Sequence, residues 1–160
     1  MPTESPSAIA DAVTRAVEAH RDRPGALLPI LHQVQDDLGY LPPSAVPGIA
    51  EALNLSRAEV HGVISFYHYF RETPSGRHLV KICRAESCQA VGADQLIQHA
   101  CRALGVEFHG ITIDGAITLE PVYCLGNCAL SPALQVGNEV HGRMTPKSFD
   151  RLVGELRKAR

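Results

Sequence analysis

Apolar residues before residue 71 recur at intervals of three and four, the spacing of helices that bury one face. The pattern predicts four short helices, which together indicate a small bundle. Their apolar positions are Ile9, Val13, Ala16 and Val17 in the first helix, Leu27, Leu28, Leu31, Val34 and Leu38 in the second, the run that ends at Leu53 in the third, and Val60, Val63 and Ile64 in the fourth.

Capping residues predict where these helices begin and end. Ser7 is placed to cap the first helix, and Gly39 is the stop signal of the second. Ser44 is expected to cap the third helix. Ser56 and Glu59 have the spacing of a capping box, which should open the fourth helix.

After residue 76 the pattern changes to alternating strands and helices. A strand is predicted over 79–83, and tight turns at Asp114-Gly115 and Gly137-Asn138 predict two hairpins. The hairpin strands are 111–113 with 116–119, and 133–136 with 139–141. One helix should end at Gly105, and Thr145 should cap another. The apolar stripes of these helices are Ala93, Ile97, Cys101 and Leu104, and Phe149, Leu152, Val153 and Leu156. This order predicts a small α/β domain with a mixed sheet between two helices.

The predicted fold class is therefore α+β, with a helical N-terminal domain over residues 1–72 and an α/β domain over residues 73–160. The segment 71–76 is the expected linker. Just before it, the stretch 66–70 contains four aromatic side chains in five positions. We interpret this stretch as bundle core and as the joint to the next domain, and the alternative is an exposed patch that docks a partner.

Composition narrows the class of protein. The 160 residues are 45% hydrophobic and 20% charged, as in soluble globular proteins. The formal net charge of -2 favours neither nucleic-acid binding nor attraction to a membrane surface. Because the N-terminus lacks a secretory pattern and no apolar run has the length of a membrane span, we expect a cytoplasmic protein without direct membrane insertion.

Four of the five cysteines form two pairs, Cys83 with Cys88 and Cys124 with Cys128. Four residues separate the first pair, three the second, and 35 lie between the pairs. Short spacings let one loop present two sulfurs to the same centre, and a long spacer lets a second loop complete the ligand set. In a reducing compartment this indicates a metal site rather than disulfides. The spacing is compatible with either zinc or a two-iron cluster.

The expected positions of the four cysteines favour convergence. Cys83 and Cys124 each close a predicted strand, and Cys88 and Cys128 are predicted in the loops that follow, so all four sulfurs should meet at one end of the sheet. Cys101 has helical spacing from Ile97 and is assigned to core packing. Pro132, four residues after Cys128, is expected to stiffen the loop, with a cis peptide as the alternative.

Other chemistries lack their motifs. No Cys-x-x-Cys is present, which argues against a dithiol oxidoreductase. Glycine-rich phosphate loops are also absent from the sequence, so nucleotide and flavin are expected to bind another chain.

The cysteine arrangement, with Leu125-Gly126 inside the second pair, resembles the thioredoxin-like 2Fe-2S ferredoxins. The family includes the small 2Fe-2S subunit of respiratory NADH:quinone oxidoreductase (complex I). Further segments that resemble those subunits are Gly39-Tyr40-Leu41-Pro42, Val63-Ile64-Ser65-Phe66-Tyr67, Gly76-Arg77-His78-Leu79-Val80 and His141-Gly142-Arg143-Met144-Thr145-Pro146. The resemblance implies a thioredoxin-like α/β domain. It also implies that Cys83, Cys88, Cys124 and Cys128 ligate one 2Fe-2S cluster, and it decides against zinc.

The residues between the ligands point to a narrower group. Complex I members typically carry a Thr-x-x-Pro-like loop in the first pair, whereas this chain has Arg84-Ala85-Glu86-Ser87. With Asn127 in the second pair and Ser131-Pro132 after it, the chain is more similar to the gamma subunit of soluble, molybdenum-containing, NAD-dependent formate dehydrogenases. The alternatives are the equivalent subunit of complex I or of an NAD-reducing hydrogenase.

This resemblance implies an electron-transfer subunit without substrate turnover of its own. The expected partners are a flavoprotein subunit that binds FMN and NAD and a molybdenum-containing subunit that oxidises formate. The molybdenum cofactor and further iron-sulfur clusters would also lie on partner subunits. Two other hypotheses are a structural zinc module that mediates assembly and an independent soluble ferredoxin, which would lack the helical N-terminal segment.

Overall fold

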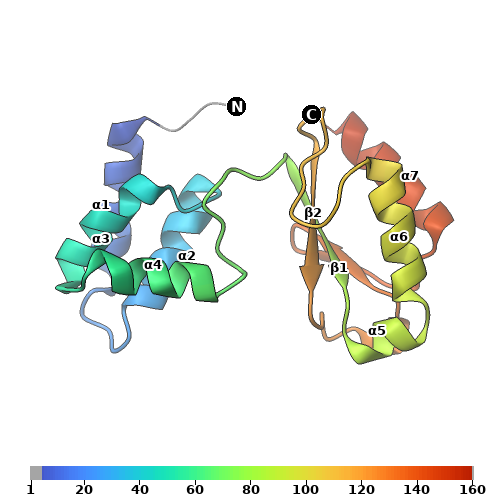
Figure 1. Cartoon of the computed structure of the whole chain (residues 1–160), viewed down its shortest axis with the longest axis horizontal. Helices are drawn as coiled ribbons and strands as arrows, with labels where there is room; N and C mark the ends of the chain where they lie inside the picture. The colour runs from blue at the N-terminus through green and yellow to red at the C-terminus, as the bar shows by residue number, and fades with distance from the viewer. Residues whose placement is uncertain (1–4, 160) are drawn as a thin grey trace. The chain divides into compact units, whose positions relative to one another are not determined.

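The computed structural model describes residues 5–159, which separate into two compact units. Met1–Pro74 is called the helical unit and Ser75–Arg160 the sheet unit (Figure 1). The division falls inside the predicted linker, two residues after the predicted boundary between residues 72 and 73.

The helical unit contains the four predicted helices, α1 (Pro6–His20), α2 (Leu27–Leu38), α3 (Val46–Leu53) and α4 (Arg57–Phe66), with a 3-10 turn, η1 (Pro43–Ala45). Their apolar faces meet in one core. Its largest fully buried side chains are Ile30, Leu31, Val34, Leu41, Ile49 and Val60. Each such side chain stabilises the unit by about 1.5–3 kcal/mol relative to exposure, so tertiary packing stabilises helices that are too short to persist alone.

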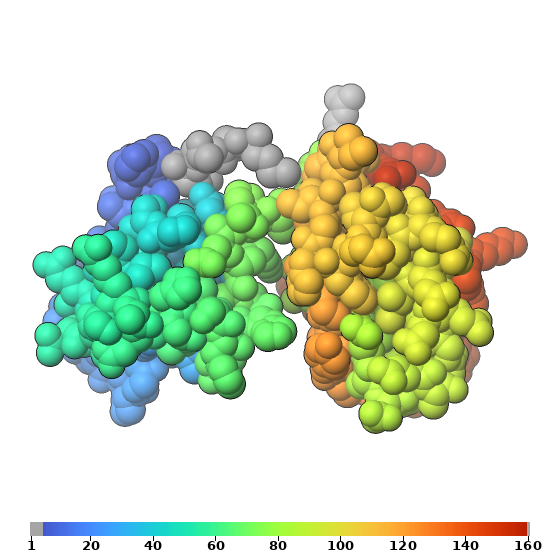
Figure 2. All heavy atoms as spheres, in the orientation of Figure 1, coloured from blue at the N-terminus to red at the C-terminus, as the bar shows by residue number. Residues whose placement is uncertain are grey.

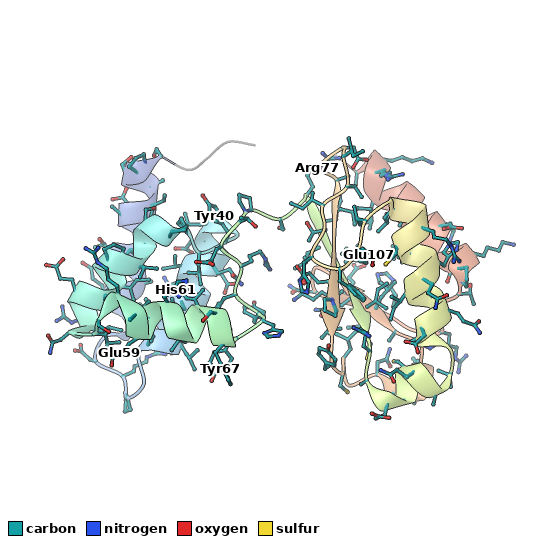
Figure 3. The ribbon with its side chains drawn as sticks, in the orientation of Figure 1. Tyr40, Glu59, His61, Tyr67, Arg77 and Glu107 are labelled. Atoms are coloured by element: carbon teal, nitrogen blue, oxygen red, sulfur yellow. The ribbon has the colours of Figure 1, made fainter. Side chains whose placement is uncertain are left out.

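The capping box that opens α4 is confirmed. The backbone amide and the hydroxyl of Ser56 each lie 2.8 Å from a Glu59 carboxylate oxygen, and the Glu59 amide donates to Ser56 Oγ at 3.2 Å. Figure 3 labels Glu59 near the beginning of this helix. The hydrogen bond from the Ser56 amide, together with that from its hydroxyl, holds the pKa of Glu59 below its ordinary value.

Two other predicted caps are wrong. Ser5, rather than Ser7, caps α1, with its hydroxyl accepting from the Ala8 amide at 3.2 Å. Pro6 takes the first helical position, because its fixed φ suits the first turn and an N–H at this position would have no partner within the helix. Ser44 lies inside η1, because Pro43 starts a 3-10 turn before α3 begins.

The aromatic stretch is mostly exposed, so its interpretation as core is wrong except at Phe70. Phe66 is 74% exposed, Tyr67 and Tyr69 are nearly half exposed, and Phe70 is buried. The buried side chain of Gln35 binds the backbone on both sides of Phe70, because it donates to the Tyr69 carbonyl at 3.1 Å and accepts from the Arg71 amide at 2.8 Å. This clamp on the backbone turns Phe70 inward, while Tyr67 follows the end of α4 (Figure 3).

The sheet unit has a four-stranded mixed sheet in the order β2-β1-β3-β4. The strands are β1 (His78–Cys83), β2 (Ile117–Val122), β3 (Leu134–Val136) and β4 (Glu139–His141). The β1 and β2 strands are parallel, and the other two pairs are antiparallel. The predicted mixed sheet and the hairpin at Gly137-Asn138 are confirmed.

The hairpin predicted at Asp114-Gly115 is reduced to an isolated bridge between Ile111 and Thr118. His109, with a φ of 69°, kinks the backbone before this segment, so 111–113 does not form a strand. The β2 strand pairs with β1 along its full length. Its other edge keeps a few hydrogen bonds to the preceding segment, with the Thr112 amide donating to the Ile117 carbonyl at 2.9 Å.

The two long helices of the sheet unit, α6 (Ala93–Leu104) and α7 (Pro146–Lys158), lie side by side (Figure 1). His99 of α6 contacts Asp150 of α7 at 2.7 Å, and its ring lies 6.1 Å from that of Phe149. Both helices pack on the sheet face that carries Val80 and Ile82. The prediction of a sheet between two helices is therefore wrong, because the apolar faces of α6 and α7 pack on the same face of the sheet.

The opposite sheet face is less buried. Leu79 and Lys81 of β1 are only half buried, in alternation with the buried Val80 and Ile82. In the space-filling view, α6 and the segment that follows it cover much of the visible side of this unit (Figure 2).

None of the helices described between residues 5 and 159 is both long and apolar enough to cross a membrane.

Candidate metal centre

The two cysteine pairs are brought together by the parallel pairing of β1 and β2. Cys83 is the last residue of β1 and is paired with Val122, the last residue of β2. Cys124 follows two residues later, so both strands deliver a cysteine to the same end of the sheet. The second cysteine of each pair comes from the segment that follows.

Those segments are helical turns rather than the predicted loops. Cys88 lies in the short helix α5 (Glu86–Ala90), and Cys128 begins the 3-10 helix η2 (Cys128–Leu130). A helical turn curls the backbone back on itself, which returns Cys88 toward Cys83 and Cys128 toward Cys124. The expectation that the four cysteines gather at one end of the sheet agrees with this placement.

The pairs differ in burial. Cys83 and Cys88 are each 2% exposed and pack with Ala93 and Ala133, whereas Cys124 and Cys128 are exposed. All are free thiols. One side of the site is therefore enclosed by protein, and the other faces outward.

The separation of the sulfurs suits two ligands on one metal. Cys124 Sγ and Cys128 Sγ are 3.9 Å apart, and two sulfurs bound to a tetrahedral metal at about 2.3 Å would be about 3.8 Å apart. The Cys88 thiol is likewise a neighbour of Cys83 and contributes to lowering the pKa of that thiol. The chain thus presents two neighbouring pairs of sulfurs.

Grouping in pairs is compatible with a two-iron cluster. Among residues 5–159, no three His, Cys, Asp or Glu side chains are gathered closely enough for one metal ion. A structural zinc ion needs four ligands around one centre, whereas each iron of a 2Fe-2S cluster takes two protein ligands. The donor set, with thiols alone and no histidine, also suits such a cluster.

Backbone amides lower the cost of charge at the buried pair. Burial opposes ionisation of the Cys83 thiol, yet hydrogen bonds from the Ala85 amide, the Cys88 thiol and the amides of Cys124 and Leu125 hold its pKa below its ordinary value. These donors would stabilise a thiolate ligand in the same way. The site therefore favours negative sulfur at Cys83 before any metal is considered.

The exposed pair shows the opposite effect. The hydrogen bond with Cys124 and the negative charge of that group raise the pKa of Cys128, and charge on Cys88 and Cys83 acts in the same direction. Neighbouring thiolates repel one another, and bound iron would remove that repulsion.

The loop between Cys124 and Cys128 has a constrained backbone. Cys124 has a φ of 88° and Gly126 a φ of 74°. A positive φ strains the backbone of a non-glycine residue by about 1–3 kcal/mol, and residues strained in this way are found mainly at functional sites. This conformation lets the Gly126 amide approach Cys124 Sγ at 3.4 Å.

A neighbouring segment fixes the far side of this loop. The Arg143 amide donates to the Leu130 carbonyl at 2.6 Å, and the Met144 amide donates to the Pro132 carbonyl at 2.9 Å. The Ser131–Pro132 peptide is cis, which was the alternative to a merely stiffening proline. A side chain at Gly142 would collide with Leu130, so this glycine permits close approach.

Two hydroxyl groups of the site could not be predicted as contacts from the sequence. Ser87 Oγ and Ser131 Oγ are 3.1 Å apart, and Cys88 Sγ lies 3.4 Å from Ser131 Oγ. The two serines lie beside different cysteine pairs, and no local pattern connects them.

Cys101 lies apart from the site, on α6. It is half buried against the sheet-unit core, as the assignment to packing requires. Burial raises the pKa of its thiol, and the nearby Glu107 carboxylate, which Figure 3 labels, raises it further.

The fold and the site define a thioredoxin-like α/β protein with two thiol pairs at one end of its sheet. The chain belongs to the thioredoxin-like 2Fe-2S ferredoxin family, whose sequence profile matches residues 13–157. That match covers nearly all of both units.

Its relatives include components of redox complexes. The chain is 31% identical to the NADP-reducing hydrogenase subunit HndA of Solidesulfovibrio fructosivorans, over 89% of this chain and 84% of the relative. It is 33% identical to an NADH-quinone oxidoreductase subunit of Rhizobium meliloti, over 93% of this chain and 89% of that protein. It is 38% identical to an NADH-quinone oxidoreductase subunit of Mycobacterium tuberculosis, over 85% of this chain and 54% of that protein.

A solved structure with the same fold is that of an NAD+-reducing NiFe hydrogenase in the air-oxidized state. The TM-score is 0.70 at 25% identity, and the match covers 86% of this chain. The chain corresponds to only 24% of the length of that hydrogenase chain.

Proposed function

We propose that Cys83, Cys88, Cys124 and Cys128 hold one 2Fe-2S cluster and that the chain is an electron-transfer subunit. The single observation that carries this proposal is the arrangement of four thiols as two pairs at one end of the sheet, with no other ligand type among them. The cluster would supply a centre that accepts and releases one electron at a time. No substrate is turned over by this chain itself.

The protein's own contribution is to hold and orient the sulfurs. The enclosed pair, Cys83 and Cys88, anchors the centre to the core, and backbone amides around Cys83 offset its negative charge. The outward pair, Cys124 and Cys128, lies beside the exposed side chains of Tyr123 and Leu130. This outward side is where a redox partner can approach closely enough to exchange electrons.

The proposed assembly is an NAD-dependent formate dehydrogenase, in which this chain is the gamma subunit. The support comes from the residues between the ligands, 84–87, and from Asn127 and Ser131-Pro132. In this assembly, formate is oxidised on a molybdenum-containing subunit and NAD+ is reduced on an FMN-binding flavoprotein subunit. Further iron-sulfur clusters would lie on those partners, and the complex would be cytoplasmic.

A second candidate is the equivalent subunit of an NAD(P)-reducing hydrogenase or of NADH:quinone oxidoreductase. The relatives favour it, since their names state hydrogenase and NADH-quinone oxidoreductase subunits. All three assignments share one cluster in this chain and an NADH-linked flavoprotein partner. They differ in the final electron donor or acceptor.

The helical unit is proposed to dock the chain on its partners. Its exposed aromatic side chains Phe66, Tyr67 and Tyr69 pack on one another and on neighbouring rings, with the centroids of Phe66 and Tyr67 5.0 Å apart. Clustered exposed aromatic rings are typical of protein interfaces. An independent ferredoxin would have no use for this surface.

Affinity purification of the tagged chain from its native cells, under anaerobic conditions, tests the assembly. The proposal predicts recovery of a flavoprotein, together with reduction of the complex by formate and formation of NADH from NAD+. Reduction by hydrogen, or electron delivery to a quinone, would identify the second candidate instead. Recovery of a monomer or homodimer without a flavoprotein would contradict the subunit assignment.

A pair of variants tests the docking surface. Phe66→Ser should reduce recovery of partner subunits while the visible spectrum of the cluster stays unchanged. Ile113→Ser is the matched control, because Ile113 is a fully exposed apolar side chain on the sheet unit. Equal losses in both variants, or no loss in Phe66→Ser, would contradict docking through the aromatic stretch.

A further inference from the structure

Two serine hydroxyls connect the segments that carry the second cysteine of each pair. Ser131 Oγ donates to the Cys128 carbonyl at 2.8 Å, and Ser87 Oγ reaches the same carbonyl at 3.3 Å. The two hydroxyls are 3.1 Å apart, and the Cys88 thiol donates to Ser131 Oγ at 3.4 Å. Both serines are half buried, which keeps their hydrogen bonds partly shielded from water.

The protons available on the two serine hydroxyls and on the Cys88 thiol determine how these hydrogen bonds respond to a bound metal. Each serine hydroxyl has one proton to donate, and the Cys88 thiol contributes a third. With a free thiol, Cys88 donates to Ser131, and Ser131 donates to the Cys128 carbonyl. A ligating cysteine has lost its proton, so its sulfur can only accept.

We propose that, in the cluster-bound protein, the Ser131 hydroxyl donates a hydrogen bond to the Cys88 sulfur. The Ser87 hydroxyl then donates a hydrogen bond to the Cys128 carbonyl, which Ser131 no longer binds. This inference rests on the proposed function, because it requires Cys88 to be a cluster ligand. Only the hydroxyl protons rotate, and no heavy atom needs to move. The two distances involved, 3.4 Å and 3.3 Å, are already present.

The consequence is a shift in reduction potential. Reduction adds one negative charge to the cluster, and a donor aimed at a ligand sulfur stabilises the reduced state more than the oxidised state. Ser131 therefore raises the potential of the centre. Ser87 acts indirectly, because it satisfies the carbonyl that would otherwise compete for the Ser131 proton. Ser131 and Ser87 are thus positioning residues outside the ligand set.

Redox titration of the cluster in the full-length protein, followed by electron paramagnetic resonance, tests the inference. Ser131→Ala should lower the midpoint potential, and Ser131→Thr, which keeps the hydroxyl, should restore it. Ser87→Ala should lower the potential by a smaller amount. The double variant should match Ser131→Ala alone, because Ser87 acts only through Ser131. An unchanged potential in Ser131→Ala, or additive shifts in the double variant, would overturn the proposal.

A second readout separates a hydrogen bond to sulfur from a structural effect. The iron–sulfur stretching bands of wild type in resonance Raman spectra should shift between H2O and D2O, and Ser131→Ala should lose part of that shift while Ser131→Thr keeps it. Equal solvent shifts in all three proteins would contradict a hydroxyl donor.

Failure of the Ser131 hydrogen bond can still be told apart from failure of the cluster assignment if a variant does not hold the cluster. If Ser131→Ala is colourless, the nearly isosteric pair Ser131→Thr and Ser131→Val replaces it, and only the valine variant should have a lower potential. If the valine variant is also colourless, Ser87→Ala decides, with a lowered potential in support and an unchanged potential against. Absence of any cluster in wild type would instead refute the proposed function.

Discussion

Replacing Gly142 by alanine should destabilise the loop that carries Cys128. A Cβ built at this position lies 2.6 Å from Leu130 Cβ and 2.8 Å from the Leu130 carbonyl oxygen. Carbon atoms normally meet at about 3.5–4.0 Å, so relief requires a shift of about 1 Å. The hydrogen bonds from Arg143 and Met144 resist that shift. Overpacking of this kind costs about 1–3 kcal/mol.

The assay is anaerobic thermal unfolding of the full-length protein, followed by the visible absorbance of the cluster. For a unit of this size, a cost of about 1–3 kcal/mol lowers the Tm by roughly 5–20 °C. Because the displaced loop carries Cys128, bleaching of the absorbance at a fixed temperature should also become faster. Gly154→Ala is the matched control. Gly154 lies in α7 with no atom within 4 Å of an added Cβ, so this change should stabilise the helix by about 0.5–1 kcal/mol.

A Gly142→Ala protein with the Tm and bleaching rate of wild type would contradict a collision between residue 142 and Leu130. It would mean that the loop after Cys128 relaxes freely and that the segment 142–144 does not fix its position. Equal destabilisation by both alanine variants would also count against a local collision as the cause.

Two further predictions follow from the separate environments of the ligands and of the capping box. Cys128→Ser should lose or weaken the cluster, whereas Cys101→Ser, outside the site, should keep the visible spectrum with a modest loss of stability; bleaching in Cys101→Ser would overturn its assignment to the core. Glu59 should titrate below the ordinary glutamate pKa of about 4.3, because the Ser56 amide and hydroxyl bind its carboxylate. Since its folded pKa is depressed, the capping box stabilises α4 above that ordinary value and loses its effect as pH falls through the folded pKa. The Ser56 amide resonance in NMR spectra should report this transition, and a midpoint at or above the ordinary value would contradict it.

The features that sequence predicted well depend on neighbouring residues. The capping box at Ser56, the helix end at Gly39 and the start of α7 at Thr145 and Pro146 are decided within one helical turn. The two core stripes also follow from local periodicity. These signals identified the elements and the segments in which the cysteines lie.

The errors arose where distant segments compete. The parallel pairing of β2 with β1 and the packing of α6 and α7 on one sheet face both join segments that are distant in sequence, and no local pattern predicts either arrangement. Gln35 binds the backbone on both sides of Phe70 from another helix and holds that side chain inward. The contact between Ser131 and Cys88 likewise joins residues far apart in sequence.

The most direct test of the cluster assignment is the metal and acid-labile sulfide content of the anaerobically purified chain. The chain should contain about two irons and two labile sulfides, with both lost when Cys83, Cys88, Cys124 and Cys128 are all replaced by serine. One zinc per chain without iron or sulfide would contradict it.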